Sequence, residues 1–171
     1  MRPPGPGRVT RRDRAEQVVG EVAALQGHAL CLEADTADAS ATARAVEYVV
    51  REWGRLDVVV ANTGVARAGG IDTLPAEDID RMIDVNVRGV VHTIRAALPH
   101  LDGDGRIVTV GSVNAERAPF AGAAAQAMIK WLALPRIGTP EEVSALVSHL
   151  VGPEGAFITG ATLAIDGGFT A

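Results

Sequence analysis

The apolar residues of this chain follow two patterns, short continuous runs and stripes with helical spacing. Continuous runs rich in Val, Ile, Leu and Ala predict buried parallel strands, because such strands are covered on both faces. These runs occupy residues 29–34, 56–61, 106–112 and 161–165. Apolar stripes predict helices over residues 13–26, from Asp38 or Ser40 to Trp53, from Thr73 or Pro75 to Ala97, and over 140–151. Strands and helices therefore alternate, which predicts an α/β fold with a doubly wound parallel sheet.

Turn and cap residues set the expected ends of these elements. Gly27 and Gly54 stand where C-cap glycines belong, just after an apolar stripe. Residues 139–142 (Thr-Pro-Glu-Glu) have the pattern of a capping box with proline at the first helical position. Residues 102–105 (Asp-Gly-Asp-Gly) predict a turn, and residues 127–134 predict a short helix that Pro135 stops.

Length, charge and cysteine content narrow the class of protein. The 171 residues suit one domain, which we expect over residues 9–171 after a disordered tail at residues 1–8. A net charge of −5 gives no indication of a nucleic-acid partner. No apolar run approaches the ~20 residues of a membrane span, and the histidines show no metal-ligand spacing, so we expect neither a membrane partner nor a metal. The single cysteine, Cys31, suggests a reducing compartment, and we expect a cytoplasmic protein.

Several ordered motifs together resemble the short-chain dehydrogenase/reductase family. They are Leu-Asp-Val-Val-Val-Ala-Asn-Thr-Gly (56–64), Asp-Val-Asn-Val (84–87), Gly-Arg-Ile-Val-Thr-Val-Gly-Ser (105–112), Arg-Ile-Gly-Thr-Pro-Glu-Glu-Val (136–143) and the stretch from Ile-Thr-Gly to Asp-Gly-Gly (158–168). The similarity covers nearly all of residues 9–171 and is nearest to the bacterial ketone or acyl-carrier-protein reductase type. It implies a Rossmann-like, three-layer α/β/α fold, hydride transfer between NADP or NAD and a carbonyl or alcohol substrate, with NADP favoured, and a homo-oligomer.

The resemblance also implies roles for individual residues. Ser112 would hydrogen-bond the substrate carbonyl, Asn86 would hold a water near the active-site lysine, and Lys130 is the candidate for that lysine. The residues implied in cofactor binding are Asp35 at the adenine amino group, Ala61, Asn62 and Gly64 near the ribose, and Arg11 and Arg12 at a 2′-phosphate. Each has a structural alternative: a strand-end serine, an asparagine paired with backbone, a turn aspartate and a solvated basic cluster.

Two pieces of the family pattern are missing from the sequence. The first is the opening strand with its glycine-rich turn, for which Gly5-Pro6-Gly7 is the only candidate and a poor one, because proline removes a donor. The second is the tyrosine four residues before the lysine, since the only tyrosine is Tyr48. We therefore expect a truncated Rossmann-like sheet and a weakened or absent activity.

Two placements of residues 113–135 remain open. In one, Gln126 stands in the tyrosine position and Lys130 is the active-site lysine. In the other, which we favour, residues 122–125 are a deletion junction and residues 126–135 belong to the helix before the Arg-Ile-Gly motif, because bulky Trp131 and Pro135 do not suit the family's long helix.

Two functions are compatible with the absence of the glycine-rich turn and the tyrosine. One is an oxidoreductase in which Ser112 orients the carbonyl. The other is a non-catalytic remnant or an interaction module that pairs with intact relatives. In either case we expect the C-terminal strand to supply the interface, because the family's long helix would be lost.

Overall fold

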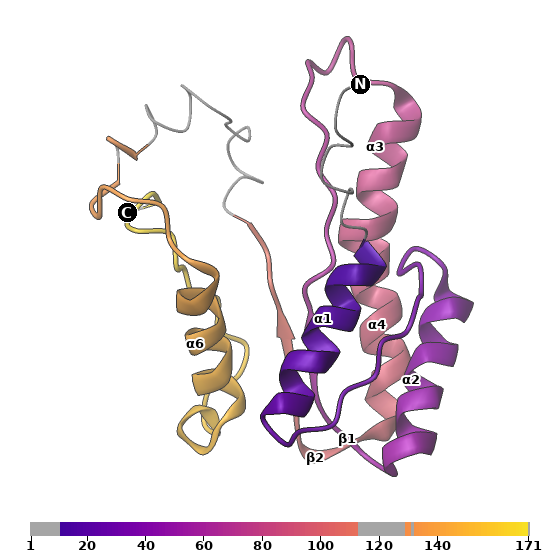
Figure 1. Cartoon of the computed structure of the whole chain (residues 1–171). Coiled ribbons are helices and arrows are strands. Elements are labelled where there is room, and N and C mark those ends of the chain that lie inside the picture. The colour runs from indigo at the N-terminus through magenta and orange to yellow at the C-terminus, as the bar shows by residue number, and fades with distance from the viewer. Residues whose placement is uncertain (1–10, 113–128, 131, 171) are drawn as a thin grey trace, which may run out of the picture. The chain divides into compact units, whose positions relative to one another are not determined.

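The computed structural model describes residues 11–112, 129–130 and 132–170 of the chain (Figure 1). The chain divides into two compact units, residues 1–34 and residues 35–171, and each is described by itself. The expected tail at residues 1–8 and the Gly5-Pro6-Gly7 segment lie outside the described residues.

The first unit contains one helix, α1 (Arg11–Ala24). Its C-terminal turn corrects the expected cap, because the left-handed residue is Gln26, at φ 61°, and not Gly27. The Gly27 N–H donates to the Val22 carbonyl at 3.0 Å, as in a Schellman motif whose C′ residue is Gln26. Gly27 is still required there, because an added Cβ would lie 2.8 Å from a Val22 methyl group.

The expected strand over residues 29–34 is not formed. These residues have no regular structure, and the only sheet among the described residues contains β1 and β2. An apolar run becomes a strand only where a neighbouring strand completes its hydrogen bonds. The run predicts the type of element but not whether a partner is present.

The second unit opens with α2 (Ala39–Trp53), whose ends agree with the sequence. The Asp38 side chain caps it by accepting from the backbone N–H groups of Ser40 and Ala41, and Gly54 ends it in the left-handed region at φ 73°. The strand β1 (Leu56–Ala61) follows with the predicted bounds.

The long helix expected from Pro75 to Ala97 is present, but it is interrupted by a π-helical turn. It comprises α3 (Ala76–Ile83), the π-helical turn η1 (Asp84–Arg88) and α4 (Gly89–Ala97), and the short 3-10 turn η2 (Leu98–His100) follows. The asparagine of interest, Asn86, lies in the π-helical turn, where such turns often mark functional sites.

The strand β2 (Leu101–Thr109) pairs in parallel with β1, which confirms the predicted parallel pairing, but it ends at Thr109 and not at residue 112 as expected. Val59 pairs with Ile107 and Ala61 with Thr109. The expected turn at residues 102–105 is wrong, because these residues lie within β2 and are accommodated by a register shift between Leu56 and Val58 of the partner strand. Helices α2 and α4 pack against each other and against β1.

The C-terminal part contains α6 (Pro140–Val151) and the 3-10 turn η4 (Pro153–Gly155). The capping box is confirmed: the Thr139 side chain accepts from the Glu142 N–H and the Glu142 side chain accepts from the Thr139 N–H. The expected strand at residues 161–165 is not formed, for the same lack of a partner strand as in residues 29–34. Of the expected helix at residues 127–134, residues 127, 128 and 131 lie outside the description, residue 130 is in a turn, and residues 132–134 are bends.

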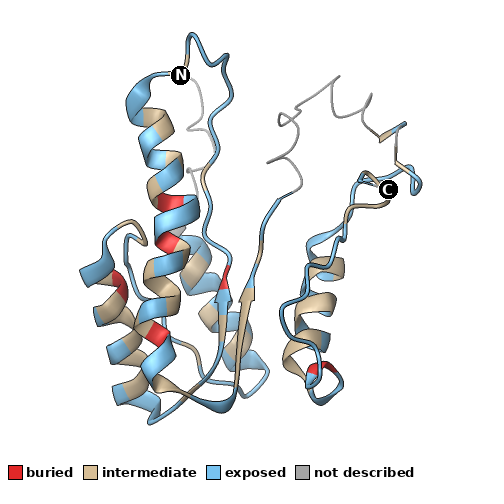
Figure 2. Cartoon of the chain, turned by 180° about the vertical axis from the view of Figure 1, so that it is seen from behind, coloured by how far each residue is buried: buried red, intermediate tan, exposed pale blue. Residues whose placement is uncertain are grey.

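The core of the described residues is small (Figure 2). The buried side chains are those of Thr42, Ala61, Val85 and Ala97, and Val85 is the largest that is fully buried. Gly89 is buried where α4 meets Thr36, and a Cβ at this glycine would lie 3.0 Å from the Thr36 hydroxyl.

Candidate functional site

The carboxyl end of β1 leads into the turn that holds Ala61, Asn62 and Gly64. Ala61 is buried, and its carbonyl accepts from the Val110 N–H at 2.9 Å, so part of its hydrogen-bonding capacity is used inside the sheet. Asn62 and Gly64 are exposed. This places an open turn at the edge of the sheet where α/β folds bind ligands.

Asn86 fixes the chain just after this turn. Its side-chain amide donates to the Val65 carbonyl at 2.8 Å, and its amide oxygen accepts from the Val65 N–H at 2.9 Å. A Cβ on Gly64 would lie 3.4 Å from the same oxygen, which is an ordinary van der Waals contact. The structural alternative for Asn86, a side chain paired with backbone, describes this contact, and Asn86 is exposed. A water held near the lysine stays a prediction.

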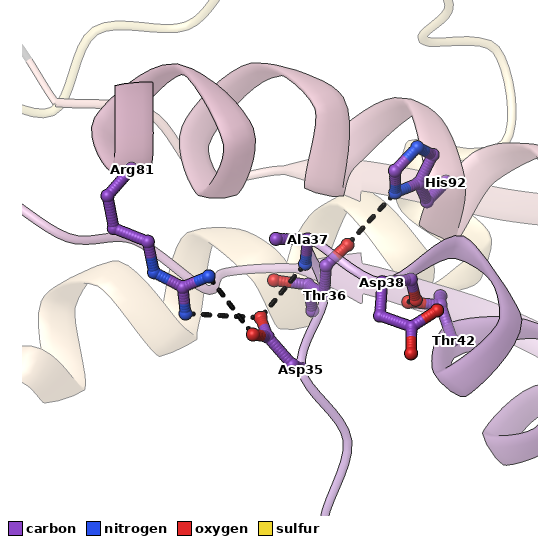
Figure 3. Close-up of polar contacts among 7 residues, drawn as sticks. All are labelled: Asp35, Thr36, Ala37, Asp38, Thr42, Arg81 and His92. Atoms are coloured by element: carbon purple, nitrogen blue, oxygen red, sulfur yellow. Dashed lines mark hydrogen bonds and ion pairs between the residues drawn. The ribbon is translucent and has the colours of Figure 1, made fainter. Parts of the chain in front are cut away.

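Asp35 begins the second unit and is drawn in Figure 3 with its partners. Its carboxylate accepts from the Ala37 N–H at 3.0 Å and from both terminal nitrogens of Arg81, at 3.0 and 3.2 Å. The hydrogen bond from Arg81 is the main reason that the pKa of Asp35 is lowered. Asp35 is therefore ionised at neutral pH and acts only as an acceptor.

A small hollow lies beside Asp35 at the end of β1. It is lined by the side chains or backbone of Thr36, Ala61, Thr63, Val85, Gly89, Val90 and Thr93. The Thr36 hydroxyl is buried and has no hydrogen-bond partner among the described residues. The hollow thus joins the Asp35 turn to the Ala61 turn within one region of the fold.

The residues expected to act on the substrate are only partly described. Ser112 is exposed, three residues after the end of β2, and Lys130 is exposed in a turn. Gln126 and the proposed junction at residues 122–125 lie outside the described residues. The roles of Ser112 and Lys130, and their closeness, therefore stay predictions.

The two arginines expected at a 2′-phosphate belong to the first unit. Arg11 begins α1, and the Arg12 side chain lies 2.8 Å from the Glu16 carboxylate, one turn away on the same helix. Both side chains of this ion pair are largely exposed. In this structure Arg12 is therefore a solvated basic residue, as the structural alternative describes. Its role at a 2′-phosphate stays a prediction.

Sequence reasoning missed Arg81 and the partner of Asn86. Arg81 lies 46 positions from Asp35 and Val65 lies 21 positions from Asn86. An arginine on the exposed face of a helix does not contribute to the apolar periodicity that predicts secondary structure. A hydrogen bond to backbone atoms requires no particular side chain at the partner position, so the sequence does not reveal that partner. Only the packing of the long helix against these two loop segments brings the groups together: Arg81 lies in α3 and Asn86 in η1.

Neither a metal centre nor a membrane-spanning helix is found in the part of the chain that the structure describes. Residues 11–112, 129–130 and 132–170 contain no cluster of three His, Cys, Asp or Glu side chains that would hold a metal ion. Within the same ranges, each helix is too short or too polar to cross a membrane.

Comparison with known proteins identifies the family. Residues 9–128 match the family described as short chain dehydrogenase, and residues 119–170 match the one described as enoyl-(acyl carrier protein) reductase. The chain belongs to the short-chain dehydrogenase/reductase family, whose members are oxidoreductases. It has that family's α/β Rossmann fold in incomplete form, as the sequence predicted.

Three proteins show how far the similarity extends in identity and coverage. The chain is 33% identical to the cyclic-di-GMP-binding biofilm dispersal mediator protein of Escherichia coli, covering 77% of this chain and 75% of the relative. It is 35% identical to a short-chain dehydrogenase/reductase of Pestalotiopsis microspora, with 61% and 39% coverage, so it spans well under half of that relative. A crystal structure of a short chain dehydrogenase from Burkholderia cenocepacia in complex with NADP shares 35% identity at a TM-score of 0.88, with 93% and 84% coverage.

The first alignment contains gaps in this chain. It runs over 178 positions, more than the 171 residues of this chain, although only 77% of the chain takes part. Some aligned positions of the relative therefore face no residue of this chain. The two family matches meet at residues 119–128, a range that includes residues 122–125.

Proposed function

We propose that this chain is a reductase-type member of its family that has lost most or all of its hydride-transfer activity. The observation that carries the proposal is that no tyrosine follows Ser112 in the sequence, because the single tyrosine of the chain is Tyr48. The substrate would be a small carbonyl compound or alcohol. We also propose a cytoplasmic location, consistent with the single cysteine.

The residues of the second unit fit the adenosine half of a nicotinamide cofactor. The Asp35 carboxylate is an ionised acceptor suited to the adenine amino group, and the open turn of Ala61, Asn62 and Gly64 suits a ribose. The NADP complex of the Burkholderia relative supports NADP or NAD as the cofactor. We favour NADP because of Arg11 and Arg12, and we expect the binding to be weak.

When bound, the nicotinamide group would supply or accept the hydride. The chain's own contribution would be the Ser112 hydroxyl, which orients the carbonyl oxygen by donating a hydrogen bond. A serine hydroxyl ionises far from neutral pH, so Ser112 cannot replace the tyrosine as proton donor. Loss of a positioned general acid typically lowers the rate by ~10²–10⁴-fold.

We favour a deletion over a simple replacement of the tyrosine. The gaps of this chain in the alignment with the Escherichia coli protein and the overlap of the two family matches at residues 119–128 support it. The deletion would have removed the tyrosine together with a helix and a strand. Lys130 would then be a residue of a later helix and not the active-site lysine.

The purified, folded chain tests the proposal directly. NADPH binding is measured by calorimetry, and NADPH oxidation is followed with a panel of ketones, beside an intact short-chain reductase as positive control. We expect weak binding and a rate at least ~10²-fold below the control. Turnover comparable to the control would overturn the proposed loss of activity.

The substitution Gln126→Tyr separates the two placements of residues 113–135. If residues 122–125 are a junction, the new tyrosine is not beside Ser112, and activity stays at the level of the parent chain. The matched variant Gln17→Tyr, on the exposed surface of α1, controls for added tyrosine. A gain in NADPH oxidation that is specific to Gln126→Tyr would contradict the deletion.

A second candidate function is that of an interaction module that pairs with itself or with intact relatives. It is favoured by exposed apolar residues on the long helix and in the turn η2 that follows it: Val87, Val91 and Leu98 are exposed by 57%, 47% and 60% and recur at spacings of four and seven residues. Exposed apolar stripes of this kind mark association surfaces. An interface through residues 161–165 also stays a prediction, since Leu163 and Ile165 are exposed.

Sedimentation of the purified chain tests this second candidate. We expect an oligomer that the double variant Val87→Glu, Val91→Glu dissociates, because it places charges in the stripe. Arg95→Glu, at an exposed position of the same helix, is the control for added negative charge. A monomeric parent chain that also fails to co-purify with a co-expressed intact reductase would exclude this function.

A further inference from the structure

The four residues from Asp35 to Asp38 form a turn that three helices hold in place (Figure 3). The Asp38 N–H donates to the Asp35 carbonyl at 2.9 Å, and the Asp38 carboxylate caps α2. From α4, His92 Nδ1 lies 3.1 Å from the Thr36 carbonyl oxygen. From α3, Arg81 reaches the Asp35 carboxylate with two nitrogens.

The Asp35 carboxylate keeps one acceptor position open in this arrangement. A carboxylate offers about four lone-pair sites. The Ala37 N–H and the two Arg81 nitrogens use three of them, at 3.0, 3.0 and 3.2 Å. The Asp35 side chain is 50% exposed, so the fourth site is within reach of a ligand.

The ion pair contributes little to the stability of the fold. Arg81 and Asp35 are 48% and 50% exposed, and exposed ion pairs are screened by water and salt. A two-pronged contact between a guanidinium and a carboxylate does, however, fix the direction of the carboxylate. The contact between Arg81 and Asp35 therefore orients the Asp35 carboxylate more than it stabilises the fold.

We infer that Arg81 is a positioning residue that holds the Asp35 carboxylate ready for the exocyclic amino group of a purine, and so makes this site select adenine. Arg81 acts through Asp35 and touches no ligand itself. The inference rests on the proposed function, because it assumes that the Asp35 turn receives the adenine of the cofactor.

Selectivity follows from donor and acceptor chemistry at one atom. Adenine carries an amino group that donates to the carboxylate, whereas hypoxanthine carries a carbonyl oxygen at the same place and would face Asp35 acceptor to acceptor. Sites that hydrogen-bond a ligand group reject analogues lacking it, because the buried or fixed polar partner is left unpaired. A carboxylate free to rotate would reject hypoxanthine less strongly, since it can turn toward water.

The test compares the affinities of the full-length chain for NADPH and for its hypoxanthine analogue, measured by NMR titration so that millimolar binding is readable. We expect the parent chain to prefer NADPH by roughly tenfold or more, as hydrogen bonds to charged groups allow. Arg81→Gln should bring the preference close to one. Arg81→Lys, which keeps the charge without the two-pronged contact, should keep only part of it.

Two further variants separate positioning from a general structural effect. Arg88→Gln breaks the Arg88–Asp84 ion pair on the same long helix and should leave the preference unchanged. Asp35→Asn should lower the preference, and Arg81→Gln should add nothing in that background, because both act through one carboxylate. A merely structural role would weaken both ligands equally and leave the ratio intact.

The outcomes distinguish the inference from the proposed function. If the parent chain prefers NADPH and Arg81→Gln keeps that preference, or if the parent chain binds both ligands equally, the role of Arg81 is overturned while cofactor binding stands. If the parent chain binds neither ligand, the proposed cofactor site fails and this inference fails with it. Should Arg81→Gln not fold, Arg81→Lys and the Asp35→Asn background decide the outcome.

Discussion

At the scale of single residues, this chain uses long-range polar contacts to fix two loop segments, one at Asp35 and one just after β1. Asn86 holds the backbone of Val65 with both ends of its amide, and Arg81 holds Asp35. Both contacts cross from the long helix to a loop. The candidate site therefore depends on side chains of α3 and η1 as much as on the loops themselves.

Removal of the Asn86 amide tests the first of these contacts. Asn86→Ala loses two hydrogen bonds to an exposed backbone segment, and we expect the free energy of unfolding to fall by about 1 kcal/mol. Urea denaturation measures the change. Asn62→Ala is the control, at an exposed asparagine in the adjacent turn, and should change the stability by much less; equal effects would contradict the anchoring role of Asn86.

At the scale of elements, the sequence predicted those whose signals are local. The bounds of β1, the Asp38 cap of α2, Gly54 and the Thr139–Glu142 capping box all follow from residues within a few positions of one another. The strands at residues 29–34 and 161–165 failed because strand formation depends on a distant partner. The same limit hid Arg81, whose partner is set only by how α3 packs.

The capping box of α6 gives a pH prediction. The Arg136 guanidinium and the Thr139 N–H hold the ionised Glu142 side chain and lower its pKa from an ordinary 4.5 to about 2. A carboxyl with a lowered pKa stabilises the folded chain above its unfolded pKa, and this stabilisation is lost as the pH falls from about 4.5 toward 2. NMR titration of Glu142 measures the value; a pKa near 4.5 would show that the contact with Arg136 is not held in solution.

Two glycines give opposite predictions for the same substitution. Gly54 ends α2 at φ 73°, where an alanine is strained, so Gly54→Ala should destabilise the chain by about 1 kcal/mol. Gly20 lies within α1 with no atom within 4 Å of an added Cβ, so Gly20→Ala should stabilise it by about 0.5–1 kcal/mol. Thermal denaturation of both variants checks the pair, and the same sign for both would contradict the helix ends described.

At the scale of the whole molecule, the family fold is recognisable although its sheet and core are reduced. Among the described residues the sheet has two strands, and Val85 is the largest fully buried side chain. The sequence retains the family motifs at residues 56–64 and 105–112, whereas the glycine-rich turn and the tyrosine are absent. We therefore expect both cofactor binding and hydride transfer to be weakened, and hydride transfer to be weakened more.

The most direct test of this account is a single-turnover measurement with the folded chain at the highest attainable NADPH concentration and a panel of ketones. This measurement reports the rate of hydride transfer, because the high NADPH concentration compensates for weak cofactor binding. The account predicts NADPH oxidation at least ~10²-fold slower than in an intact short-chain reductase measured in parallel. A rate equal to that of the intact enzyme would contradict the loss of the proton donor.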